Sequence, residues 1–252
     1  MIMAHLTCDT PSLRPCTLTC YSWYIAAVPQ LHHTLIIGTG DPEGWKFRWP
    51  NPIWYKHMLG LLPLVRKLHI HLRTGYDHGP GTVSPKMFRC CILGKFSALT
   101  NVQELGIEFL DIPKFMPKLR RYFGRLSPTV RSLALRSPKG SHRQIIYFVG
   151  LFQYLEDLKL LFECPSFGSM KEVPVGDLTL VPLFAPPLRG RLTMTLSKRV
   201  ELLEDMIRLF GGIRFRSMDL SSVEGARLLL NACVETLQTL RLHQTDPRGE
   251  WP

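Results

Sequence analysis

The chain has 252 residues, 45% hydrophobic and 20% charged, and its 31 Lys and Arg against 20 Asp and Glu give a net charge of +11. This composition is typical of a folded globular protein and argues against a disordered one. It also argues against membrane-spanning helices, because the charge-free apolar runs at residues 145–155 and 178–188 have 11 residues each and a spanning helix needs about 18.

Residues 1–50 are expected to form a small helical cap that seals one end of the fold. A short apolar helical pattern links Leu13, Cys16, Leu18, Cys20 and Trp23, and residues 32–37 are expected to form a strand. We expect no secretory signal, because no basic start, apolar run and small-residue cleavage site occur together. The seven cysteines are an odd number without paired spacing, which favours a reducing compartment and a cytoplasmic or nuclear protein.

From residue 51 onward, a strand-like phrase of the form apolar-x-x-apolar-x-apolar recurs. Its seven middle anchors are Leu68, Leu105, Leu133, Leu158, Leu192, Met218 and Leu240. Most of their spacings are close to the roughly 20–29 residues of leucine-rich repeats. Helical patterns fall between the phrases: residues 87–96, 113–123 with a restart at Pro117, 145–153, 200–210, and a helix opening at Ser221.

This alternation predicts an α/β fold in which residues 51–252 form an irregular leucine-rich-repeat solenoid of parallel strands and crossover helices, preceded by the helical cap. Two observations leave an ordinary α/β protein open as the alternative. The spacings are uneven, and the Asn or Cys that follows the third anchor in regular leucine-rich repeats is missing.

Alternate residues of each phrase are expected to point away from the core and to line a concave surface. The outward positions comprise six Lys or Arg and four acidic residues, and such a mixed surface suits a protein partner better than a phosphate backbone. A merely solvated surface is the alternative for each residue. The candidate partner-binding residues are His69, His71, Arg73, Glu108, Arg136, Lys159 and Arg241.

No cofactor, metal or catalytic site is expected. The sequence lacks G-x-S-x-G, H-E-x-x-H, G-x-x-x-x-G-K-[ST] and G-x-G-x-x-G motifs, so we predict a protein that is not an enzyme. His69 and His71 point the same way from one strand, but no third ligand lies near them in the sequence. Cys16 and Cys20, four residues apart, likewise lack further metal ligands at short spacing.

The N-terminal spacing H-L-x-x-D-x-x-S-L-x-x-C-x-L-x-C-x-S-W, at residues 5–23, resembles the second half of an F-box. The resemblance to leucine-rich-repeat F-box proteins of the divergent fungal type extends loosely over the rest of the chain. It implies that Leu6, Leu13, Cys16, Leu18, Cys20 and Trp23 contact a Skp-type adaptor of a cullin–RING ubiquitin ligase, and that the repeats hold a protein substrate. Asp9 also matches the motif. The family's first F-box helix has no counterpart here, so the F-box is N-terminally incomplete.

The missing helix is explained either by a truncated gene model or by a loss of ligase assembly with the repeats kept. Three functions therefore stay open at this point. The first function is substrate recognition for an SCF-type ubiquitin ligase. The second is an orphan leucine-rich-repeat scaffold without a ligase. The third, a basic nucleic-acid-binding protein, depends only on the net charge. Trp23 is expected to be either packed in the cap or an adaptor contact.

Overall fold

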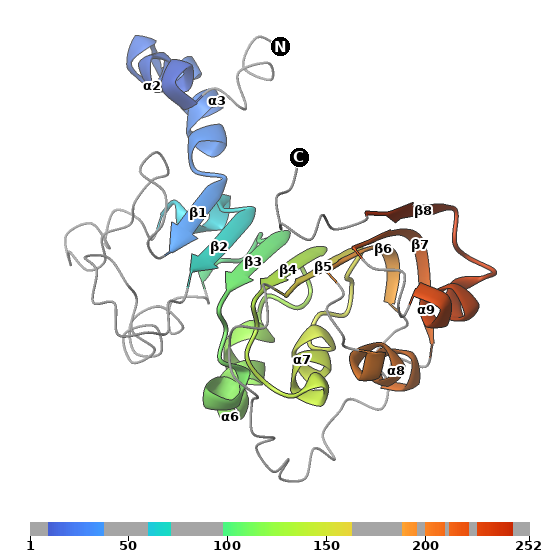
Figure 1. Ribbon diagram of the computed structural model, residues 1–252. Helices are drawn as coiled ribbons and strands as arrows, with labels where there is room; N and C mark the ends of the chain where they lie inside the picture. The colour runs from blue at the N-terminus through green and yellow to red at the C-terminus, as the bar shows by residue number, and fades with distance from the viewer. Residues whose placement is uncertain are drawn as a thin grey trace, which may run out of the picture.

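The structure is a computed structural model, and it describes residues 10–37, 60–71, 98–162, 188–195, 200–209, 212–221 and 226–243. Eight strands in these ranges form one parallel sheet, in which every strand lies beside the one that precedes it in the chain (Figure 1). The strands are β1 (Thr34–Ile37), β2 (Lys67–His71), β3 (Glu104–Glu108), β4 (Ser132–Arg136), β5 (Asp157–Leu161), β6 (Leu188–Met194), β7 (Ile213–Leu220) and β8 (Thr239–Leu242). The predicted α/β class with parallel strands is confirmed.

The seven recurring phrases are the strands β2 to β8, and their middle anchors lie side by side in one row across the sheet. The strand expected at residues 32–37 is β1, and Leu35 extends the row to an eighth member by pairing with Leu68. The sheet therefore begins inside the segment 1–50. From β1 to β7 the anchors are buried in one continuous apolar core, as expected when one face of a period-2 strand packs against helices.

Helices cover the core side of the sheet (Figure 1). They are α6 (Ile112–Phe123), α7 (His142–Val149), α8 (Val200–Leu209) and α9 (Ala226–Cys233). The short 3-10 helix η1 (Leu62–Leu64) precedes β2. The helix expected at residues 87–96 lies outside the described residues, as do residues 222–225 in front of α9.

Two helix predictions need correction. Helix α6 runs without interruption through Pro117, although the missing N–H of this proline costs one hydrogen bond to Pro113. The helix buries Phe115, Leu119 and Phe123 in the core, and this burial outweighs the lost bond. Helix α7 starts at residue 142 and ends at 149, instead of 145–153.

The early start of α7 is explained by a capping box at its first turn. The Ser141 hydroxyl accepts a bond from the Gln144 N–H at 3.4 Å, and the Gln144 carboxamide oxygen accepts one from the Ser141 N–H at 2.9 Å. Reciprocal bonds of this kind satisfy two backbone donors that a helix otherwise leaves unpaired. Helix α7 then packs between α6 and α8, with Phe148 edge-to-face against Phe123 at 5.0 Å between ring centroids.

The phrase in β6 is one residue longer than most of the others, and the pairing of β6 with β7 shifts register between Gly190 and Arg191, where Arg216 of β7 is the extra residue. Gly190 has a φ of +85°, and a Cβ on it would lie 2.0 Å from the backbone oxygen of Glu156 on the neighbouring chain segment. The same oxygen accepts a hydrogen bond from the Arg191 N–H at 2.7 Å. Only glycine fits this place, where two backbones approach closely at a positive φ.

The N-terminal segment forms a hairpin of two helices, α2 (Thr10–Thr19) and α3 (Tyr21–Leu31), that stands apart from the sheet at its β1 end (Figure 1). Leu13, Cys16 and Ala27 make a small core of their own. The single helical pattern expected through Trp23 is therefore wrong, since Cys20 is extended, with φ −160° and ψ 167°, and separates the two helices. No glycine or proline at position 20 signals this break in the sequence.

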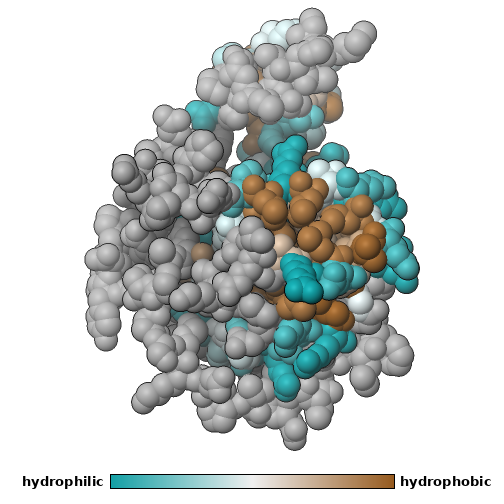
Figure 2. Space-filling view, turned by 45° about the vertical axis from the view of Figure 1, so that its right-hand side comes forward, coloured by the Kyte–Doolittle hydropathy of each residue, from teal (hydrophilic) through white to brown (hydrophobic). Residues whose placement is uncertain are grey.

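The two ends of the sheet differ in exposure. At one end, Leu35 and Ile37 of β1 are buried; at the other, all four residues of β8 are exposed. Figure 2 turns this side of the molecule toward the viewer and shows hydrophobic residues gathered there among hydrophilic ones. No helix in the described ranges is long and apolar enough to cross a membrane.

Candidate interaction surfaces

The face of the sheet opposite the helices, which we call the polar face, is made of the outward residues of the strands. Strand register arranges these residues in rows. One row contains Lys67, Glu104, Ser132, Asp157, Arg191, Ser217 and Thr239. The next contains His69, Gly106, Ala134, Lys159, Thr193, Asp219 and Arg241. These outward positions are those predicted from the period-2 pattern.

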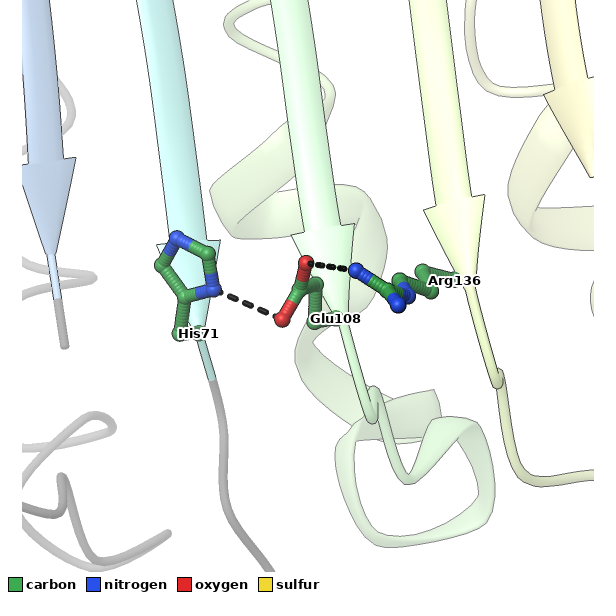
Figure 3. A network of polar contacts seen from close by, with 3 residues as sticks. All are labelled: His71, Glu108 and Arg136. Atoms are coloured by element: carbon green, nitrogen blue, oxygen red, sulfur yellow. Dashed lines mark hydrogen bonds and ion pairs between the residues drawn. The ribbon is translucent and has the colours of Figure 1, made fainter. Parts of the chain in front are cut away.

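A charged network crosses three strands of the polar face (Figure 3). Glu108 on β3 lies between His71 on β2 and Arg136 on β4. Its Oε2 is 2.7 Å from the His71 Nδ1, and its Oε1 is 3.4 Å from an Arg136 terminal nitrogen. The structure thus brings three of the predicted partner-binding residues together. The carboxylate beside His71 comes from a residue 37 positions away, so local sequence spacing did not reveal it.

The same arrangement recurs toward the other end of the sheet. Asp219 on β7 is 3.5 Å from an Arg191 terminal nitrogen through its Oδ2 and 2.8 Å from the His243 Nε2 through its Oδ1. In both networks one carboxylate is shared by an arginine on one side and a histidine on the other. The carboxylate thereby links side chains that lie on either side of its strand.

Two further acidic residues of the polar face also pair with cations. Lys67 and Glu104 lie 2.9 Å apart across β2 and β3. Asp157 is 3.5 Å from the Lys159 ammonium and accepts a hydrogen bond from the Ser132 hydroxyl at 3.1 Å. All four acidic residues predicted on this face are therefore engaged with its cations, which leaves it nearly neutral.

His69 lies on β2, next to Gly106 of β3. A Cβ on Gly106 would be 2.6 Å from the His69 Nδ1, so the absence of a side chain on β3 makes room for the imidazole. Burial, with a smaller contribution from the nearby His71, lowers the pKa of His69 below its ordinary value of 6.5. The neutral imidazole is therefore favoured at this position. Of the other predicted residues, Arg73 lies outside the described ranges.

The second candidate surface is the outside of the α2–α3 hairpin. Five large apolar side chains of the hairpin are exposed: Leu18, Tyr21, Trp23, Tyr24 and Ile25. By helical spacing Tyr21, Tyr24 and Ile25 share one face of α3, whereas Trp23 lies on the face of Ala27, which packs against α2. Leu18 is the most exposed at 88%, and Trp23 exposes 40% of its surface. The expectation that Trp23 might be packed as a buried cap residue is thus wrong. Exposed apolar clusters of this kind mark interaction sites on soluble proteins.

The structure divides the predicted adaptor-binding residues into two groups. Leu18, Cys20 and Trp23 are exposed, whereas Leu13 and Cys16 are buried in the core of the hairpin. The prediction of direct contact is corrected for Leu13 and Cys16, which support the exposed surface from behind. Leu6 and Asp9 lie outside the described residues. Tyr21, Tyr24 and Ile25 were missed, although they follow Cys20 directly in the sequence.

Within the described ranges, no group of three or more His, Cys, Asp or Glu side chains is placed to hold a metal ion. His69 and His71 share one face of β2, but His71 is committed to Glu108. Cys16 is buried and Cys20 exposed, so the two do not form a common site.

Comparison with known proteins finds no match, because no family model, no curated protein and no solved structure is significantly similar to the chain.

Proposed function

We propose that the chain is a protein-interaction module of the leucine-rich-repeat type that recruits a protein substrate to an SCF-type ubiquitin ligase. The α2–α3 hairpin would dock on a Skp-type adaptor, and the polar face of the sheet would hold the substrate. The observation that carries the proposal is the cluster of exposed apolar side chains on the hairpin, which stands apart from the sheet.

Both the buried core of the hairpin and its exposed side chains support this proposal. Its own core of Leu13, Cys16 and Ala27 gives it a defined shape. Burial of the exposed aromatic and aliphatic side chains on binding would stabilise the complex by about 25 cal/mol per Å² of apolar surface. Tyr and Trp are the residue types most often found at the energetic centre of protein interfaces.

The polar face supports a protein partner over a nucleic acid. Phosphate binding is driven by clustered unpaired cations, whereas Lys67, Arg136, Lys159 and Arg191 each lie within 4 Å of a carboxylate. Alternating charges of both signs instead favour specific pairing with complementary side chains of a protein.

A scaffold without a ligase is the second candidate. It is favoured by the burial of Leu13 and Cys16, because two of the residues that match the F-box pattern have a structural role that needs no adaptor. In this case the exposed cluster on the hairpin would bind a different protein.

The test measures binding of the purified 252-residue chain to a purified Skp-type adaptor. Binding of the wild-type chain is expected, together with a loss of at least tenfold in affinity for Leu18→Glu at unchanged melting temperature. Val234→Glu is the matched control, since Val234 is also an exposed apolar residue but lies just beyond α9, and it should bind like wild type. A folded wild-type chain that does not bind the adaptor would refute ligase assembly and leave the scaffold.

A further inference from the structure

Strand β8 is the last strand of the described ranges, and its apolar anchors are partly exposed. Leu240 and Leu242 expose 37% and 47% of their surface, whereas Met218 and Leu220, their register partners on β7, are fully buried. Within the described ranges, no strand pairs with the other edge of β8. The apolar anchor positions therefore extend to β8, whereas the buried anchors extend only to β7.

Among the described residues, the backbone groups at this edge of β8 also have no hydrogen-bond partner. The His243 N–H donates to the Leu220 oxygen at 2.8 Å, and alternate residues of a parallel strand bond to the same neighbour. Thr239 and Arg241 thus direct their N–H and C=O groups at β7. The N–H and C=O groups of Leu240 and Leu242 point to the opposite edge, where they can form hydrogen bonds with an added strand.

The charge pattern indicates what the added strand must carry. Arg241 is the register partner of Asp219, but both oxygens of that carboxylate are already engaged, Oδ2 by Arg191 and Oδ1 by His243. Arg241 consequently forms no ion pair with any described residue, unlike Lys67, Arg136, Lys159 and Arg191. An acidic side chain on the far side of β8 would complete the pattern of the polar face.

We propose that an extended segment of a partner protein pairs with the free edge of β8, with an acidic residue beside Arg241 and an apolar residue on either side of it, next to Leu240 and Leu242. Strand β7 already has this pattern on the other edge of β8, as Met218-Asp219-Leu220. Backbone bonds supply affinity in this mode of recognition, and the side chains supply specificity. The site is separate from the α2–α3 hairpin and requires no ubiquitin ligase.

The probe is a fluorescent, acetylated peptide with the sequence of residues 215–221, Phe-Arg-Ser-Met-Asp-Leu-Ser, compared with the same peptide carrying Asp219→Lys. The full chain should bind the first peptide about three- to tenfold more tightly, because one ion pair is exchanged for a like-charge contact. Arg241→Glu in the protein should reverse this preference. Arg189→Glu, a charge reversal at an exposed residue of β6, should leave the preference unchanged.

Hydrogen exchange tests the geometry in the same samples, since peptide binding should slow exchange of the Leu240 and Leu242 amides. Equal affinity for the two peptides, or no binding by a chain with an unchanged circular dichroism spectrum, would overturn the proposal. So would a sedimentation experiment in which the chain alone forms a dimer that protects these two amides, because the occupant would then be a second copy. None of these results depends on adaptor binding, so failure here is distinct from failure of the proposed ligase link.

Discussion

The close approach of β6 to the backbone of Glu156, directly before β5, makes Gly190→Ala an informative substitution. A methyl group would lie 2.0 Å from the Glu156 oxygen and 2.8 Å from its carbonyl carbon. Both are backbone atoms, so no side chain can rotate away and the two strands must separate. The Arg191 N–H bond to the same oxygen would be weakened as they move.

The expected cost is the sum of three effects. Overpacking a well-packed site costs about 1–3 kcal/mol, and holding an alanine at positive φ costs about 1–3 kcal/mol. The smaller conformational freedom of the unfolded alanine chain returns about 0.4–1 kcal/mol. We therefore expect the free energy of unfolding to fall by about 3 kcal/mol, which lowers the melting temperature by about 6–12 °C in a chain of this size.

Two other glycines separate the contributions. Gly212 has a φ of +102° with no atom within 4 Å of a built Cβ, and Gly60 has open space and no positive φ. Gly212→Ala should cost about 1 kcal/mol from the backbone alone, and Gly60→Ala should be neutral or slightly stabilising. Denaturant unfolding followed by circular dichroism measures all three. If Gly190→Ala were within 1 kcal/mol of Gly212→Ala, the argument from backbone contact would be refuted.

Glu108→Ala should lower the free energy of unfolding by about 1 kcal/mol because it removes the ion pair with Arg136 and the hydrogen bond with His71. Glu156→Ala, at a side chain 70% exposed, should change it by about 0.3 kcal/mol or less; equal effects in denaturant unfolding would contradict the network. Because burial lowers the pKa of His69 below 6.5, the unfolded chain takes up its proton first as the pH falls, so stability should decrease from about pH 6.5 down to the folded pKa. The His69→Asn variant should show a shallower pH dependence, and an unchanged slope would count against a buried neutral imidazole. Finally, burial raises the pKa of Cys233, so alkylation followed by mass spectrometry should label the exposed Cys20 well before Cys233; labelling at equal rates would contradict the packing of α9.

The strands were predictable because their signal is local. Each phrase places apolar residues at alternate positions within six residues, and burial of one face of a strand requires no knowledge of its neighbours. The middle anchors and the outward positions could therefore be assigned before the sheet was known. The strand Thr34–Ile37 was also expected, but Leu35 was not recognised as a member of the row because its segment lacks the full phrase.

The features that escaped prediction depend on residues far apart in the chain. Glu108 contacts His71 only after two strands pair in register, and the need for glycine at position 190 arises from the backbone of Glu156 beside β5. The break at Cys20 allows Leu13 and Cys16 of α2 to pack against Ala27 of α3. Helical periodicity alone predicted one helix there, because it does not register a contact between two helices. The exposed cluster on the hairpin follows from this fold-back, because it turns Leu18 and Tyr21 outward.

The sequential order of the strands has a consequence for how the protein is made. Among the described strands, each one after β1 pairs with the strand synthesised just before it, so none of them has to wait for a distant part of the chain. Each strand can be stabilised by its contact with the strand before it, and domains begin to fold from the N-terminus while translation continues. The sheet can therefore grow on the ribosome in the direction of synthesis, from β1 to β8, with each new strand covering the exposed edge of the last.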